Sequence, residues 1–187
     1  MTPVRRLLGL DPGTRLLGWG VIDVCGRRLE APGHGVLRAP ARRPLPERLA
    51  LLAAGLREVL ARFEPHEAAI EEGFYGRDAR AALRLGEGRG ALLLVLAEAG
   101  LVVTGYANNV VKRAVTGGGR ATKDRVQVMV VRMLGLREEP ETLDASDALA
   151  VAICHQQHTS MGALGPGGPS PRILEAIRRA QGRGGRR

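Results

Sequence analysis

Residues 5–24 read RRLLGLDPGTRLLGWGVIDV, and this stretch decides how the fold begins. The apolar run Arg5–Leu10 predicts a strand, Asp11–Thr14 (DPGT) has the composition of a turn, and Leu16–Val24 predicts a second strand. A third strand is predicted at Arg28–Leu37, after another glycine-containing turn. Short turns join antiparallel neighbours, so the sequence predicts a three-stranded meander at the start of the domain.

Beyond the meander, the pattern alternates between helices and strands. Helices are predicted where apolar residues recur at helical spacing, at Leu45–Phe63, Asp78–Ala99, Asn108–Thr116, Lys123–Leu134 and Leu143–His158. Two short apolar runs predict further strands at Glu67–Glu71 and Leu101–Tyr106. Crossover helices between strands imply parallel pairing. The predicted fold is therefore α/β, a mixed five-stranded sheet flanked by helices on both faces.

Length and composition indicate one globular domain with a polar tail. The chain has 187 residues, of which 44% are hydrophobic, enough to bury a core. We expect one domain over residues 1–158 and a mobile basic tail, rich in Gly, Pro and Arg, over residues 159–187. No apolar run reaches the ~18 residues of a membrane span. The two cysteines, Cys25 and Cys154, are too few for a disulfide framework, so we expect a cytoplasmic protein without membrane contact.

Charge is unevenly distributed along the chain. The net charge is +9, with +6 in residues 111–137, −5 in residues 138–160 and +5 in residues 161–187. Such a division favours a polyanionic partner, of which nucleic acid is the usual one. A GC-rich genome would also raise the arginine content. That bias does not explain why the only two lysines, Lys112 and Lys123, flank three consecutive glycines.

Two acidic residues are predicted where strands end. Asp11 ends the first strand and Glu71 ends the fourth. If these strands are parallel neighbours, their carboxyl ends meet at one edge of the sheet, where α/β proteins bind ligands. An aspartate before Pro-Gly is also ordinary turn chemistry, so Asp11 alone leaves both interpretations open.

Two further acids, Asp144 and Asp147, stand at positions i and i+3 of the last predicted helix. This spacing places both carboxylates on one face of the helix, where like charges repel. Compensation of the helix dipole in the first turn is one explanation, and a shared cation is the other. A pair of Mg²⁺ ions, or Mn²⁺ in their place, would bring about +4 charges to balance four carboxylates through oxygen ligands.

A carboxylate cluster that holds two metal ions is typical of phosphodiester hydrolysis. Lysine suits such a site because its flexible side chain can reach a single phosphate oxygen, whereas the planar guanidinium of arginine favours bidentate partners. Lys112 and Lys123 are therefore candidates to hold the scissile phosphate and to offset the charge that develops on it.

Four segments together resemble the RuvC family of bacterial Holliday-junction resolvases. They are GLDPGTRLLGWGVI (9–22), AIEEGFYGRDARAALRLGEGRG (69–90), VKRAVTGGGRATKDRVQVMV (111–130) and LDASDALAVAICH (143–155). Each segment alone would be a weak signal, but the four in this order are specific. The resemblance implies an RNase H-like fold over the domain at residues 1–158, and a homodimer. It also implies divalent-metal-dependent nicking of two opposed strands of a four-way DNA junction, in homologous recombination and DNA repair.

The resemblance also assigns roles to individual residues. It implies four metal-binding acids and two basic residues near the active site, which are Asp11, Glu71, Asp144 and Asp147, with Lys112 and Lys123. Glu72 follows Glu71 directly, so the choice between them depends on the alignment. Because successive residues of a strand face opposite sides, only one of the two can face the other acids, and we favour Glu71.

Contacts with DNA are expected just beyond Glu71. Phe74 matches an aromatic residue that the family uses to stack on or separate bases near the crossover. Tyr75, Arg77 and Arg80 follow closely, and such a mixture of aromatic and basic side chains suits base stacking, although aromatic residues more often pack in a core. The family's partners, the junction-binding protein RuvA and the branch-migration motor RuvB, are implied by the same resemblance.

Other interpretations use some of the same residues. An actin-like phosphotransferase also carries Asp-x-Gly-Thr after its first strand, but 187 residues leave no room for its second lobe. A non-catalytic nucleic-acid-binding protein would tolerate neutralisation of the four acids. An RNase H-like family proposed to process ribosomal RNA shares the first segment but not the whole set. Cys154, His155 and His158 hint at a zinc site, but no second pair of ligands lies nearby in the sequence.

Overall fold

The computed structural model describes residues 4–73 and 78–160, which form five strands and five helices. The strands are β1 (Arg5–Pro12), β2 (Leu16–Cys25), β3 (Arg28–Arg38), β4 (Glu67–Glu72) and β5 (Val102–Ala107). The helices are α1 (Leu45–Phe63), α2 (Ala79–Glu98), α3 (Asn108–Thr116), α4 (Lys123–Leu134) and α5 (Leu143–Ser160). Every predicted element is confirmed, with each end within two residues of its predicted position. The tail at residues 161–187 lies outside the described residues, so the predicted domain boundary stays a prediction.

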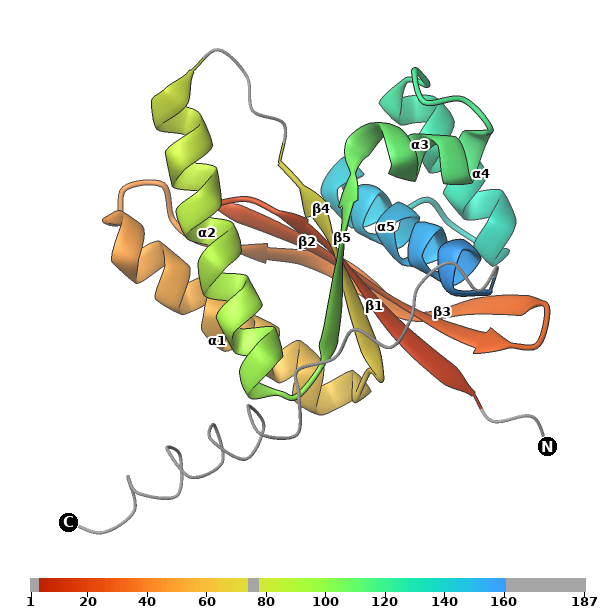
Figure 1. Cartoon of the computed structure of the whole chain (residues 1–187), viewed down its shortest axis with the longest axis horizontal. Coiled ribbons are helices and arrows are strands. Elements are labelled where there is room, and N and C mark those ends of the chain that lie inside the picture. The colour runs from red at the N-terminus through yellow and green to blue at the C-terminus, as the bar shows by residue number, and fades with distance from the viewer. Residues whose placement is uncertain (1–3, 74–77, 161–187) are drawn as a thin grey trace, which may run out of the picture.

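The sheet has the mixed pairing that the sequence predicts. Its strand order is β3-β2-β1-β4-β5. The meander strands β1, β2 and β3 pair antiparallel, whereas β4 pairs in parallel with both β1 and β5. In Figure 1 the long strands cross at the centre of the molecule, with helices on either side. The parallel β1–β4 pair brings two carboxyl ends to the same edge of the sheet.

Helices cover both faces of the sheet and create two hydrophobic cores (Figure 1). Helices α1 and α2 lie on one face, and α3, α4 and α5 lie on the other. In β1, Leu8 packs into the core under α1 and α2, and its neighbour Leu7 packs into the core under α5. A strand buried on both faces reads as a continuous apolar run, which explains the sequence of β1.

Helix α5 is the most deeply buried helix of the described chain. Every residue from Ala148 to Cys154 has 0% exposed surface. The helix lies directly on β1 and β2, where Gly9 removes the side chain that would otherwise separate them; a Cβ at Gly9 would come 2.6 Å from the amide nitrogen of Ala152. None of the described helices, α5 included, is long and apolar enough to cross a membrane.

Helix α2 carries three glycines that the sequence alone leaves unexplained. Gly88 is buried and packs against the turn between β1 and β2. Among the described residues, Cβ atoms added at Gly86 and Gly90 would have no heavy atom within 4 Å apart from the neighbouring backbone of α2 itself. Packing on its own domain therefore accounts for Gly88 but not for Gly86 and Gly90. Leu94 is 60% exposed on the same helix, so α2 presents a partly apolar outer surface.

Candidate active site

Asp11 and Glu71 stand side by side at the carboxyl ends of β1 and β4. The parallel register pairs Leu10 with Ile70, so Asp11 and Glu71 are the next residues of the two strands. Both carboxylates lie on the face of the sheet that α5 covers, because side chains alternate along a strand and Ala69 belongs to that core. The structure thus brings together two of the four predicted acids.

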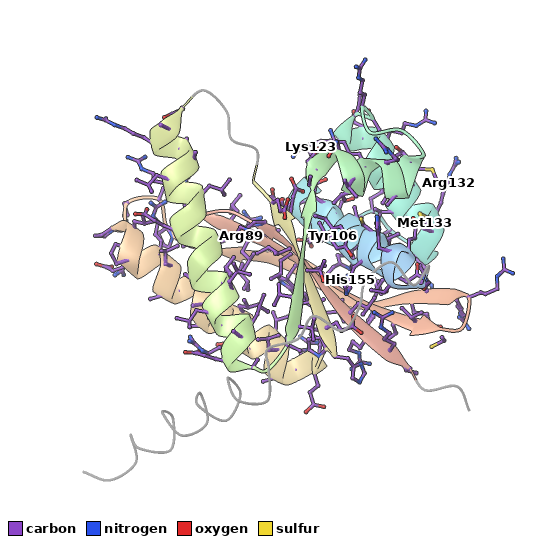
Figure 2. The ribbon with its side chains drawn as sticks, in the orientation of Figure 1. Arg89, Tyr106, Lys123, Arg132, Met133 and His155 are labelled. Atoms are coloured by element: carbon purple, nitrogen blue, oxygen red, sulfur yellow. The ribbon has the colours of Figure 1, made fainter. Side chains whose placement is uncertain are left out.

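Glu72 faces the other side of the sheet. Ile70 belongs to the core under α1 and α2, and Glu72 follows it by two residues. A Cβ added to Gly105 of β5 would lie 2.5 Å from Glu72 Oε1 and 3.2 Å from Arg89 Nη2. Arg89 belongs to α2, as Figure 2 shows. The geometry therefore separates the two glutamates, and only Glu71 shares a face with Asp11.

Helix α5 supplies the other two acids from its first turns. The helix begins after Thr142, whose Oγ1 accepts a hydrogen bond from the amide of Ala145 at 3.3 Å. The backbone of Asp144 lies against Gly18 of β2, and Gly18 is the sheet partner of Asp11. Asp147, one turn later, is close enough to raise the pKa of both Asp11 and Glu71 by charge repulsion.

Burial and mutual repulsion raise the pKa values of two of the acids. Burial, followed by repulsion from Glu71, Asp147 and Asp144, raises the pKa of Asp11 to about 7. Burial also raises the pKa of Glu71, against the hydrogen bond from Asn108. A carboxyl group that resists ionisation at neutral pH marks a place where a cation would be stabilising.

Lys123 is the cation that contacts the acids directly. Its Nζ lies 3.1 Å from Asp147 Oδ2, and this hydrogen bond raises the pKa of Lys123. Helix α4 starts at Lys123, and the side chain of Thr122 caps it by accepting a hydrogen bond from the amide of Arg125. The Lys123 side chain is 57% exposed, so it can move away from Asp147 at low energetic cost.

Lys112 approaches the same cluster from α3. Its charge opposes the upward shift of the Glu71 pKa, which places it within electrostatic range of that carboxylate. Gly117 ends α3 with a φ of 76°, a left-handed conformation that favours glycine, and donates its amide hydrogen to the carbonyl of Arg113. This chain reversal lets α3 and α4 bring one lysine each to the acids.

Asn108 is a site residue that the sequence interpretation missed. Its Nδ2 donates a hydrogen bond to Glu71 Oε1 at 2.8 Å. Asn108 is the first residue of α3, directly after β5, and β5 is the parallel neighbour of β4. A polar residue just past a third parallel strand was the signal that could have identified it.

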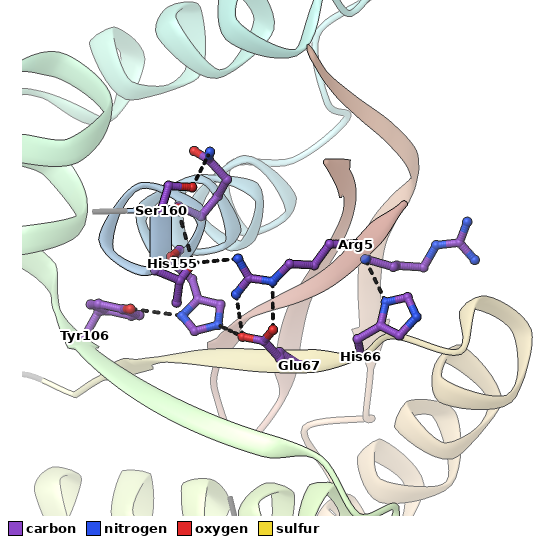
Figure 3. Close-up of polar contacts among 9 residues, drawn as sticks. Arg5, His66, Glu67, Tyr106, His155 and Ser160 are labelled. Carbon is purple, nitrogen blue, oxygen red and sulfur yellow. Dashed lines mark hydrogen bonds and ion pairs between the residues drawn. The ribbon is translucent and has the colours of Figure 1, made fainter. Parts of the chain in front are cut away.

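A second polar cluster lies near the other end of α5 (Figure 3). Arg5 Nε and Nη2 donate hydrogen bonds to the two oxygens of Glu67 at 2.7 and 2.6 Å. Glu67 also accepts a hydrogen bond of 3.0 Å from His155 Nε2, and the opposite ring nitrogen, Nδ1, accepts one of 2.9 Å from the hydroxyl of Tyr106. Hydrogen bonding to Arg5 lowers the pKa of Glu67, and burial lowers the pKa of His155, which keeps the imidazole neutral. We call these four residues the balanced cluster.

The contacts of the balanced cluster also bear on the possible zinc site at Cys154, His155 and His158. His155 is fully engaged with Tyr106 and Glu67, and the ring of His158 lies against Tyr106 and Cys154. Within residues 4–73 and 78–160, no three His, Cys, Asp or Glu side chains, those of the four acids included, stand together as a ready set of metal ligands. The Cys154–His158 segment therefore contributes to packing and hydrogen bonding.

The four acids at the other end suit a hard divalent cation by their chemistry. All their donors are carboxylate oxygens, which Mg²⁺ and Mn²⁺ prefer. Two of the carboxylates are turned to protein partners, Glu71 to Asn108 and Asp147 to Lys123. Side-chain rotation would have to turn these oxygens toward a common ion. If the Glu71 and Asp147 side chains rotate in this way, the carboxylate donors and the raised pKa of Asp11 fit a metal centre.

The predicted DNA contacts are described only in part. Phe74, Tyr75 and Arg77 lie outside the described residues. Arg80 is exposed in the first turn of α2, where its backbone amide donates a hydrogen bond of 2.9 Å to Oδ1 of the capping residue Asp78. All four assignments stay predictions.

Sequence comparison identifies the family. The family model described as "Crossover junction endodeoxyribonuclease RuvC" matches residues 7–155, a span that includes the four acids and both lysines. The chain belongs to the RuvC family. The RuvC crossover junction endodeoxyribonuclease of Rhodospirillum rubrum is 52% identical over 159 residues, covering 85% of this chain and 93% of the relative. The RuvC of Brucella suis is 47% identical over 153 residues, covering 82% and 88%.

Solved RuvC structures share the architecture. The structure of Thermus thermophilus RuvC matches with a TM-score of 0.77 and 37% identity, covering 84% of this chain and 97% of that one. T. thermophilus RuvC in complex with a Holliday junction substrate matches with a TM-score of 0.79 and 36% identity, covering 85% and 97%. The RNase H-like fold that the resemblance implied is confirmed for this member of the RuvC family.

Proposed function

We propose that this chain resolves four-way (Holliday) DNA junctions by nicking two opposed strands, as an endonuclease of cytoplasmic recombination and repair. One observation carries the proposal: four carboxylates and a lysine converge at one edge of the sheet in a chain of the RuvC family. The solved T. thermophilus relative bound to a Holliday junction substrate supports the choice of DNA structure. Because such a junction has approximate twofold symmetry, two matched cuts require two active sites.

Asp11, Glu71, Asp144 and Asp147 are the residues that would hold Mg²⁺, two ions in each active site, with Mn²⁺ able to replace them. Bound metal would activate the attacking water and stabilise the leaving 3′ oxygen of the scissile phosphodiester. The raised pKa of Asp11 supports this assignment, because an uncompensated acid there gains more from a divalent cation than an ordinary surface carboxylate does.

The two lysines would act on the phosphate. In the described structure Lys123 forms an ion pair with Asp147, so this pair must open before either side chain can bind another ligand. Release of Asp147 frees a carboxylate for metal binding and frees a flexible ammonium group for the phosphate. Lys112 lies within electrostatic range of Glu71 and would approach the phosphate from α3. Together they would offset the negative charge that develops during cleavage.

The dimer and the DNA contacts complete the proposal. The outer surface of α2, with open space at Gly86 and Gly90, is the candidate surface for a second copy of this chain. Phe74 would stack on bases near the crossover, and Tyr75, Arg77 and Arg80 would contact the DNA that leads away from it. RuvA and RuvB are the partners that the family resemblance implies, and neither bears on the chemistry of the acids.

The proposed function can be tested with an end-labelled four-way junction and a linear duplex of the same sequence. Each is incubated with the protein and Mg²⁺, and the products are separated on a denaturing gel. We expect paired nicks on opposed strands of the junction and an uncut duplex. A junction that shifts on a native gel but is never cut would contradict the proposal and favour a non-catalytic binding protein.

A further inference from the structure

Three glycines of β1 and β2 lie directly under α5. A Cβ at Gly9 would collide with the carbonyl oxygen of Ala148, in the middle of the helix. A Cβ at Gly20 would come 2.7 Å from two side-chain carbons of Leu149. Each glycine therefore allows the helix to lie closer to the sheet than any side chain would permit.

Gly18 differs from the other two because it touches an acid of the candidate site. A Cβ there would collide with the carbonyl oxygen of Asp144, come 2.6 Å from its carbonyl carbon and come 3.2 Å from its Cβ. Two of these atoms are backbone atoms, which cannot move aside by a change of rotamer. In the sheet, Gly18 pairs with Asp11. One residue thus contacts the backbone of one acid and is the strand neighbour of another.

The backbone conformation does not by itself demand glycine at this position. Gly18 lies in the regular β2 strand, and its φ is outside the left-handed region, where glycine would be favoured. What requires glycine here is the space that α5 occupies. Gly26, in the turn between β2 and β3, is the opposite case, with a φ of 64° and open space around it.

We propose that Gly18 is a positioning residue, whose missing side chain sets the height of Asp144 above Asp11. This inference rests on the proposed function, because the height matters only if the two acids share a metal centre. Replacement by alanine would force the first turn of α5 outward, since a methyl group and a carbonyl group cannot occupy the same space. A displacement of about 1 Å at a catalytic group can cost about 10²-fold in rate.

The test compares Gly18→Ala with Gly20→Ala in the full chain. Gly20→Ala is the matched control, because it adds the same methyl group two residues along the same strand. There the methyl group would come 2.7 Å from the side chain and 3.0 Å from the amide nitrogen of Leu149, and it would not meet the backbone of Asp144. For each protein, the melting temperature is measured against Mg²⁺ concentration. Junction affinity in EDTA and the single-turnover cleavage rate at saturating protein are measured in parallel.

We expect Gly18→Ala to need at least ~10-fold more Mg²⁺ for half-maximal stabilisation and to cleave about 10²-fold more slowly, with junction affinity unchanged within about twofold. Gly20→Ala should have a lower melting temperature than the wild type without metal, but the Mg²⁺ concentration for half-maximal stabilisation, the Mg²⁺ midpoint, should be that of the wild type. A folded Gly18→Ala protein with the wild-type midpoint would overturn the proposal. A wild-type protein that does not respond to Mg²⁺ would overturn the proposed metal centre instead.

A second variant keeps the test decisive if Gly18→Ala does not fold. Asp144→Glu retains Gly18 and lengthens the side chain by one methylene, so a fixed backbone height should misplace its carboxylate and raise the Mg²⁺ midpoint at least ~10-fold. If Gly18→Ala folds, the double variant Gly18→Ala/Asp144→Glu should need less Mg²⁺ for half-maximal stabilisation than Gly18→Ala does, because the longer side chain spans the added gap. An Asp144→Glu midpoint equal to that of the wild type would contradict the proposal.

Discussion

The two ends of α5 carry polar clusters of opposite character. At its start, four carboxylates meet one contacting cation among residues 4–73 and 78–160, which is Lys123, and the pKa of Asp11 rises to about 7. Toward its end, in the balanced cluster, Glu67 is held by both Arg5 and His155, and its pKa falls, chiefly through the hydrogen bond from Arg5. Both clusters are built from the same strands and the same helix.

The difference shows how a functional cluster can be told from a structural one. Buried charges that serve only the fold are paired, because an unpaired charge inside a protein is costly. The balanced cluster obeys this rule and gains nothing from a metal ion. Of the four acids at the start of α5, Asp147 alone has an ion pair within the described residues, so their arrangement makes sense when a cation that is not part of the chain completes the site.

The largest expected effect comes from neutralising one of the unbalanced acids. Asp11→Asn should reduce the single-turnover rate of junction cleavage by at least about 10³-fold, because the variant loses a charged metal ligand. Junction affinity in EDTA should stay the same or increase, because a negative charge near phosphate has been removed. Glu72→Gln, on the other face of the same sheet edge, is the control and should cleave within a few-fold of the wild-type rate. An Asp11→Asn protein that cuts at the wild-type rate would remove Asp11 from the mechanism.

The balanced cluster should respond in stability instead of activity. Arg5→Met keeps the apolar part of the side chain but removes the guanidinium group, so the Glu67 carboxylate loses its charged partner and two hydrogen bonds. We expect the free energy of unfolding, measured by urea titration, to fall by about 2 kcal/mol. Arg28→Met is the matched control, because the Arg28–Glu30 pair is exposed, and it should change stability by less than about 0.5 kcal/mol. Equal losses in the two variants would mean that the balanced cluster is no more stabilising than a surface ion pair.

Lys123→Ala should separate the two roles given to this lysine. Cleavage should slow by about 10- to 30-fold because a charge that stabilises the phosphate is lost. Less Mg²⁺ should be needed for half-maximal thermal stabilisation, because Asp147 is no longer paired with an ammonium group. Arg132→Ala removes a charge from the last turn of the same helix and should leave the Mg²⁺ midpoint unchanged. A Lys123→Ala midpoint higher than that of the wild type would contradict this account of the ion pair.

The two clusters should also differ in the pH dependence of stability without metal, which should have opposite signs in the two. The folded-state pKa of Asp11 is raised from 3.8 to about 7, so its contribution is fully present below pH 3.8 and is lost as the pH rises toward 7. The pKa of Glu67 is lowered from 4.5, so its contribution is present above pH 4.5 and is lost as the pH falls. In EDTA, the free energy of unfolding of Asp11→Asn, relative to that of the wild type, should therefore rise by about 1–3 kcal/mol between pH 4 and pH 7. A constant difference across this range would contradict the raised pKa.

The sequence was sufficient to predict the elements and the meeting of the acids, and the reason is physical. The apolar periods and turn residues are local signals, and Asp11 and Glu71 converge because two buried parallel strands must end at the same edge. The i, i+3 spacing of the α5 acids and the position of the two lysines made them candidates, and the family resemblance gave all of them roles in one active site. Their geometry relative to the sheet then came from the structure.

Long-range polar pairing could not be predicted in the same way. The contacts Arg5–Glu67 and Glu67–His155 span 62 and 88 residues of sequence, and no local pattern specifies which groups will meet at such distances. Asn108 and the Lys123–Asp147 pair were missed for the same reason, since each joins the end of one element to another. The role of Gly18 is visible only once α5 has been placed on the sheet.

The most direct test of the central claim is a carboxyl-detected NMR titration of aspartate-labelled protein, with and without Mg²⁺, using Asp11→Asn to assign the Asp11 signal. We expect an Asp11 carboxyl that titrates near pH 7 in the metal-free protein and stays ionised through the same range when Mg²⁺ is present. An Asp11 signal that titrates at an ordinary aspartate value and does not respond to Mg²⁺ would contradict the claim that the unbalanced acids form a metal site.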